Sequence, residues 1–432
     1  MSMNAFAIVL YGAGQLGMMM LTRYFFQWII RFADTGKDDP GGALFTASLV
    51  GALFFGFRIF DAAIDPVTGS LGDRWVAKGR ERRSLLWLAF LLPAIGLVMV
   101  FAPSFAMPHL LRWLLLFSGM TLFFVGYSLY AIPYWSLLED YSRGHEGTRT
   151  VLSNTLGAGV LLATGVGFIV SPMLVDRFGF LTGAMIFGAV GTVLMALPYF
   201  ASPPGVVAHK AEELPGMWRS LGASLRHSRF LAVVLLFAGA HMSLTVMTSA
   251  APYIAERLLG GTLKDVALLL GPFLGTAVPT FILVPRFSRR YGWEKATLLG
   301  AVILSAAYLG AGLLGQGIIG TPLQTAMLVF AVAGPGSAFV LGLEGEAVAG
   351  CAARSTYKST GMYFGVFNLV VQTMNGLALF LTGILAEIDA KWAVRAMPMM
   401  AGGMCVLGIV VYFLSSKSDP DVTTSREIPL RT

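Results

Sequence analysis

Charged residues are scarce in this chain, and their scarcity excludes most classes of soluble protein. Lys, Arg, Asp and Glu together make up 12% of its 432 residues, whereas hydrophobic residues make up 56%. Soluble domains carry about 25% charged residues. The composition therefore predicts a polytopic membrane protein whose main surrounding is a lipid bilayer.

Cysteine is nearly absent, and so are the motifs of enzymes. Cys351 and Cys405 lie far apart in apolar surroundings, which gives neither a disulfide framework nor a metal-ligand spacing. Glycine-rich stretches such as Gly12-x-Gly14 follow no strand and include no lysine in the Walker context. We expect a protein that is not an enzyme and holds no cofactor. The first four residues carry no basic group, so we also expect no cleaved signal peptide.

Apolar segments long enough to cross a bilayer recur about twelve times. A spanning helix needs roughly 20 apolar residues, and candidates start near residues 5, 43, 84, 110, 150, 178, 230, 265, 296, 321, 359 and 393. The longest central polar segment divides them six and six. We therefore predict an all-α membrane protein with two six-helix bundles at 1–200 and 230–415, a cytoplasmic linker at 201–229 and a tail at 416–432.

Basic residues collect in short loops on one side of these spans, which accounts for the net charge of +7 without a nucleic-acid partner. Basic residues outnumber acidic ones in 73–83, 286–295 and the central linker, but not in the first connection at 31–39. The positive-inside rule then places both termini in the cytoplasm. The loop 139–149 is an exception, with more acidic than basic residues.

Matching basic loops after the second span of each half indicate a duplicated bundle. The first contains Gly69-Ser-Leu-Gly-Asp73-Arg74, which resembles the loop signature of the major facilitator superfamily. The resemblance implies two pseudo-symmetric bundles, alternating access and a substrate site near the midplane between them. It also implies a cytoplasmic gate, to which we assign Asp73, Arg74 and Glu346; for Glu346, simple solvation at the interface remains the alternative.

The second predicted span contains three charged residues, although a charged side chain within the membrane is energetically unfavourable. Arg58, Asp61 and Asp65 fall on one helical face, and a charge at mid-membrane costs from about 2.5 kcal/mol upward. Two carboxylates one turn apart offer a compact site for Na⁺. Their mutual repulsion raises one pKa and makes a proton an alternative occupant. Arg58 is the expected counter-charge; the alternative is a purely stabilising ion network.

Three windows resemble the glycoside-pentoside-hexuronide:cation symporters of the melibiose-permease type. They are Arg58-x-x-Asp61-Ala-x-x-Asp65-Pro-x-x-Gly69, the stretch from Tyr127 to Leu137, and the stretch from Ser359 to Gly365. The resemblance implies that Asp61, Asp65 and Ser128 hold the coupling cation, Na⁺ or H⁺.

The sugar contacts of that family are missing. Where the resemblance places an acidic residue in spans one and four and an arginine in span five, this chain has Met19, Ala131 and Gly157, and span eleven has no lysine. We therefore do not expect melibiose-like transport, although cation coupling remains.

The predicted cavity is mainly apolar, with amide, hydroxyl and aromatic groups that suit sugars or amphiphiles. Taken singly, these residues are more often packing than ligand contacts. The predicted lining comprises Gln15, Met19, Tyr127, Tyr130, Ala131, Trp135, Asn154, His241, Asn368, Gln372 and Asn375.

Two further polar residues lie inside predicted spans. Arg23 in span one either snorkels to the interface or meets an anionic substrate. His241, with Thr245 and Thr248 one and two turns later, forms either an interhelical hydrogen bond or a proton-relay or substrate site.

These observations predict a monomeric secondary transporter that moves a small solute together with Na⁺ or H⁺. We place it in the bacterial inner membrane or in a membrane derived from it. One alternative is a carrier of a non-sugar solute, such as a lysolipid, another amphiphile or an ion. The other is a transport-inactive membrane sensor or assembly factor.

Overall fold

The computed structural model describes residues 4–37, 42–142, 146–201, 228–316, 320–353 and 360–416, and these residues form helices joined by turns. Eleven helical segments in these ranges are long and apolar enough to cross a membrane. The predicted all-helical membrane fold is confirmed. Most of the predicted linker and nearly all of the predicted tail lie outside the described residues.

One very long segment explains why eleven segments correspond to twelve predicted spans. Helix α6 (Glu146–Ala196) continues through Gly179, whose φ of 80° and ψ of 172° are not helical. Two predicted spans, starting near 150 and 178, therefore run together across a kink. Glycine tolerates this positive φ because it has no Cβ.

The chain divides into two compact units. Unit 1 contains the described parts of 1–212, 248–271 and 379–391, so it includes short pieces from the second half of the sequence. Its main elements are α1 (Ala5–Ala33), α2 (Ala47–Ala77), α3 (Arg83–Ala89), α4 (Leu92–Phe101), α5 (His109–Ser142), α6 and η1 (Leu197–Ala201). The later pieces hold the end of α8 (Ser228–Tyr253), η2 (Ile254–Leu258), η3 (Leu263–Asp265) and the end of α12 (Thr360–Glu387).

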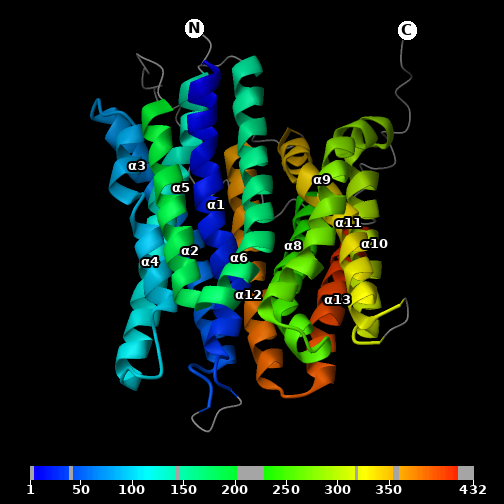
Figure 1. Cartoon of the computed structure of the whole chain (residues 1–432). Helices are drawn as coiled ribbons and strands as arrows, with labels where there is room; N and C mark the ends of the chain where they lie inside the picture. The colour runs from blue at the N-terminus through cyan, green and yellow to red at the C-terminus, as the bar shows by residue number, and fades with distance from the viewer. Residues whose placement is uncertain are drawn as a thin grey trace. The chain divides into compact units, whose positions relative to one another are not determined.

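Helix α1 is the centre of unit 1 and packs most extensively against α6 (Figure 1). Gly17 of α1 permits this approach, because a Cβ there would lie 2.6 Å from the carbonyl oxygen of Gly191. Farther along α1, Phe25 is fully buried, and its ring centroid lies 4.6 Å from that of Phe123 and 5.5 Å from that of Phe54. Aromatic packing thus fixes α1 against α5 and α2.

Unit 2 contains the described parts of 213–247, 272–378 and 392–432. Its elements are most of α8, most of α9 (Val266–Tyr291), α10 (Trp293–Gly310), η4 (Ala311–Leu313), α11 (Pro322–Ala353), most of α12 and α13 (Lys391–Ser416). Helices α10 and α11 lie side by side (Figure 1). The two backbones approach closely at glycines, since a Cβ on Gly336 of α11 would lie 2.8 Å from the carbonyl oxygen of Gly300 of α10. Small residues at such crossings let helices in a membrane approach closely.

Candidate functional site

The two aspartates of α2 contact α5 through the hydroxyl group of Ser128. Ser128 Oγ lies 2.6 Å from Asp61 Oδ1 and 2.9 Å from Asp65 Oδ1. Arg58 Nη1 donates to Asp61 Oδ2 at 2.9 Å. Asp61 is 1% exposed and Ser128 is fully buried. The structure therefore brings together all four residues that the sequence assigned to cation binding and its counter-charge.

Helical spacing and aromatic packing position this cluster. Arg58 and Asp61 are one turn apart on α2, which sets their ion pair. The Arg58 guanidinium carbon lies 5.3 Å from the Phe26 ring centroid and 5.7 Å from that of Phe124. Such cation–π contacts hold a guanidinium where water is scarce. Within the described part of the chain, Arg58 Nε has no hydrogen-bond partner.

A hydroxyl group carries one proton, so Ser128 donates to only one of its two carboxylate neighbours at a time. A proton on that carboxyl group or a cation between the oxygens also stabilises the other short oxygen–oxygen contact. The charges of Arg58, Asp61 and Asp65 sum to −1 when both carboxylates are ionised. The carboxylate and hydroxyl oxygens of the cluster are of the kind that hard cations prefer as ligands.

Beside this cluster, α5 presents aromatic side chains to α1. Trp135 Nε1 donates to Gln15 Oε1 at 2.9 Å, and Tyr127 is partly accessible. Met19 on α1 is also partly accessible. Trp135, Tyr127 and Met19 keep some accessible surface, whereas Gln15 is 4% exposed.

Two residues predicted to line the cavity are instead packed inside unit 1. Tyr130 is fully buried, and its hydroxyl donates to the Met195 carbonyl oxygen at 2.7 Å. Ala131 is 1% exposed. Both lie on the side of α5 that faces neighbouring helices, so neither has surface for a ligand in this structure.

Unit 2 holds the remaining predicted cavity residues. His241 Nε2 lies 2.7 Å from Glu344 Oε2, and Thr245 Oγ1 donates to Asn375 Oδ1 at 2.9 Å. Gln372 is 8% exposed, and its Oε1 has no partner among the described residues. Asn368 is exposed. His241 is therefore placed for an ion pair or proton exchange with Glu344, a partner on α11.

The predicted gate is described only in part. Ser288 Oγ lies 3.2 and 3.0 Å from the two carboxylate oxygens of Glu346 and donates its one proton to this carboxylate. The side chains of Asp73 and Arg74, and that of the predicted cavity residue Asn154, lie outside what the structure describes.

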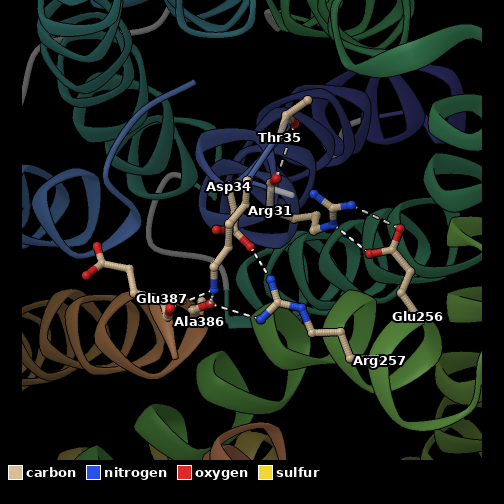
Figure 2. A network of polar contacts seen from close by, with 8 residues as sticks. Arg31, Asp34, Thr35, Glu256, Arg257, Ala386 and Glu387 are labelled. Atoms are coloured by element: carbon tan, nitrogen blue, oxygen red, sulfur yellow. Dashed lines mark hydrogen bonds and ion pairs between the residues drawn. The ribbon is translucent and has the colours of Figure 1, made fainter. Parts of the chain in front are cut away.

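A second charged cluster, which was not predicted from the sequence, lies in unit 1 where the ends of α1, η2 and α12 meet (Figure 2). Arg31 Nε donates to Glu256 Oε2 at 2.6 Å, and Arg257 Nη2 donates to Asp34 Oδ2 at 2.5 Å. Lys37 Nζ donates to the carbonyl oxygens of Ala386 and Glu387 at 2.9 and 2.6 Å. In the sequence, these residues resemble ordinary solvent-exposed charges at helix ends. Their hydrogen bonds and ion pairs form a network because distant segments of the chain come together in the fold.

The fold and these polar sites within long apolar helices define a multi-pass membrane protein of the transporter type. Residues 10–415 match the family model described as MFS/sugar transport protein, and the chain belongs to that family of the major facilitator superfamily. The match supports a secondary transporter rather than an enzyme.

Solved structures show the same fold at low sequence identity. One is a bacterial homologue of the human lysosomal transporter Spinster in an inward-facing, unoccupied conformation. It has a TM-score of 0.68 and 16% identity, over 96% of this chain and 98% of that one. Another is a proton-dependent oligopeptide family transporter with a TM-score of 0.67 and 12% identity, over 94% of this chain and 99% of that one. No curated protein matches the chain in sequence.

Proposed function

We propose that this secondary transporter couples the movement of a small solute to Na⁺ or H⁺ by alternating access, with Asp61, Asp65 and Ser128 as the cation site. The proposal also retains the likeness of α2 and α5 to the melibiose-permease type of symporter. Alternating access follows from the superfamily plan of two bundles around a central site.

The contact of Ser128 with two carboxylates is the observation that carries this proposal. Ser128 Oγ lies 2.6 and 2.9 Å from carboxylate oxygens of Asp61 and Asp65, and Arg58 pairs with Asp61. Carboxylate and hydroxyl oxygens are the ligands that hard cations prefer. A bound Na⁺ or an added proton neutralises the cluster and satisfies the second contact, so occupancy favours this compact arrangement.

Purified protein in detergent tests the cation site before any solute is known. We expect NaCl to raise the apparent Tm relative to choline chloride at equal ionic strength if Na⁺ couples. We expect the apparent Tm to depend on pH instead if H⁺ couples. Asp61→Asn and Asp65→Asn should abolish that response, because each removes one carboxylate charge. Asp176→Asn, on an exposed residue of α6, is the matched control.

Uptake into proteoliposomes tests coupling once a solute is found. Wild-type protein should accumulate solute under an imposed Na⁺ or H⁺ gradient, whereas the two asparagine variants should at most equilibrate it. Full gradient-driven accumulation by both variants would contradict the proposal. A wild-type protein that shows neither a Na⁺ response nor a variant-sensitive pH response would contradict it as well.

A non-sugar amphiphile is the second candidate for the solute. It is favoured by Met19 and Ala131, which stand where sugar carriers of the resembling family have acidic residues. A solute panel in the thermal assay separates this candidate from sugars. Stabilisation by no solute and no cation would favour the transport-inactive scaffold.

We propose that the protein is a monomer in the bacterial inner membrane, or in a membrane derived from it. Both termini then lie in the cytoplasm. The one-sided distribution of basic loops supports this orientation. Protease access to tags at both ends, in cells and in inverted vesicles, checks it.

A further inference from the structure

Arg23 is a charged residue inside α1. Within the described part of the chain it forms no ion pair or hydrogen bond, and its Nε is buried. Its stem passes α6 at Gly167, where a Cβ would lie 2.9 Å from Arg23 Cβ. Charges within membrane spans are usually paired, and those that are not mark functional positions.

Arg23 lies away from both ends of α1. Ten residues separate it from the helix end at Ala33, which corresponds to about 15 Å at 1.5 Å per residue. Arg23 therefore lies nearly three helical turns from this end of α1. Gly167 on the neighbouring helix leaves room for its stem within unit 1.

Unsatisfied polar atoms gather around the same part of α1. Gln27, one turn beyond Arg23, is fully buried, and neither its Nε2 nor its Oε1 has a partner among the residues described. Arg58, whose Nε is also unsatisfied, stacks on Phe26 of this turn. Buried polar groups in native proteins are normally hydrogen-bonded, so three such side chains together indicate a site that a ligand completes.

Tyr127 links this site to the carboxylates. It lies close enough to Arg23, Arg58, Asp61 and Asp65 to interact electrostatically with each of them. These four charges sum to zero when both carboxylates are ionised. A coupling cation at Asp61 and Asp65 then leaves a net charge of +1, which one anionic group on the solute would cancel.

We propose that the transported solute carries an oxyanion, a carboxylate or a phosphate, and that Arg23 binds it beside Tyr127. This inference rests on the proposed transport function and names the chemical class of its solute. The planar guanidinium group matches the two oxygens of a carboxylate or phosphate. Binding of the cation removes negative charge near the anion, so the two ligands favour each other's binding.

Matched pairs of probes test the proposal with full-length protein in detergent. The pairs are octanoate and octanol, glucose 6-phosphate and glucose, and lysophosphatidate and monoacylglycerol, with inorganic phosphate as a separate probe. We expect the wild-type protein to bind the anionic member of at least one pair at least tenfold more tightly than its neutral partner. Binding of inorganic phosphate alone would assign the site to the free anion rather than to an organic solute.

Variants of Arg23 test whether this side chain is responsible for the preference for anionic probes. Arg23→Gln should reduce anion affinity at least tenfold, Arg23→Lys should retain part of it, and Arg177→Gln, on an exposed residue of unit 1, should leave it unchanged. The Na⁺ or pH response of each variant serves as the folding control, because it reports on the carboxylates. An anion preference that survives Arg23→Gln, or no preference in any pair and no phosphate binding, overturns the inference. An intact cation response in that case leaves the proposed coupling standing.

Discussion

Arg257 Nη2 lies 2.5 Å from Asp34 Oδ2, and this ion pair joins the C-cap residue of α1 to η2 across 223 residues of sequence (Figure 2). Its two partners differ in exposure, with side chains 21% and 2% exposed respectively. Arg257 also donates to the Ala386 carbonyl oxygen at 2.9 Å. Arg257 therefore has another acceptor and some contact with solvent, whereas Asp34 depends on its cationic neighbours.

We predict unequal effects when this pair is broken. Arg257→Gln leaves a nearly buried carboxylate without its ion-pair partner, which should cost about 2–4 kcal/mol of stability near pH 7. Asp34→Asn should cost less, because Arg257 keeps its carbonyl acceptor and solvent. The apparent Tm of the purified variants measures both effects.

The exposed pair Arg83–Glu81 supplies the control, since Glu81→Gln should change stability by no more than about 0.5 kcal/mol. Equal losses for Arg257→Gln and Asp34→Asn would contradict the asymmetry.

The loss caused by Arg257→Gln should also depend on pH. Burial raises the pKa of Asp34 above its ordinary value, and Arg257, Lys37 and Arg31 oppose that rise. A raised pKa means that the folded protein holds this proton more tightly than the unfolded chain, so the contribution of Asp34 to stability falls as pH rises. Removing Arg257 raises the pKa further.

We therefore expect the destabilisation by Arg257→Gln to be smaller at pH 5 than at pH 7, because Asp34 is more protonated at the lower pH. Thermal unfolding of wild type and variant at both values checks this. The double variant Asp34→Asn with Arg257→Gln should lose the pH dependence.

Ser128→Ala should weaken the cation response without removing a charge. Ser128 Oγ lies within hydrogen-bond distance of both Asp61 and Asp65, and a hydrogen bond to a charged group contributes about 1.5–3 kcal/mol. We expect the Na⁺ affinity to fall at least about tenfold, which corresponds to about 1.4 kcal/mol. Cation titration followed by thermal shift measures it.

Ser136→Ala is the matched control on the same helix, because among the described residues Ser136 donates to the Ile132 carbonyl oxygen of its own turn. An unchanged cation affinity in Ser128→Ala would show that this hydroxyl is not a ligand.

The sequence could predict the features that are determined within a single helix. Arg58 and Asp61 form their pair because residues three apart share a helical face. The apolar runs predicted the spans, and Gly179 accounts for the joining of two of them. Ser128 was paired with these carboxylates through family resemblance, since no local rule connects α5 with α2.

Features that depend on helix rotation and distant contact could not be read from the sequence. Tyr130 is in the same helix as Tyr127, yet its hydroxyl reaches the Met195 carbonyl oxygen inside the bundle. Packing of α5 against its neighbours decides which aromatic residue keeps accessible surface. Likewise, Arg31 binds Glu256 although 225 residues separate them in the sequence. The sequence around each residue is that of an ordinary solvent-exposed charge at a helix end.

Two glycines of α11 should respond in opposite ways to alanine. A Cβ on Gly336 would lie 2.8 Å from the Gly300 carbonyl oxygen and 3.0 Å from the Leu304 nitrogen, so the backbone of α10 has to shift. Overpacking of this kind costs about 1–3 kcal/mol. A Cβ on Gly345 would meet nothing within 4 Å, and alanine favours a helix over glycine by up to about 1 kcal/mol. We expect Gly336→Ala to lower the apparent Tm and Gly345→Ala to leave it unchanged or raise it. A similar loss of stability in both variants would show that close contact between α10 and α11 is not what requires glycine at 336.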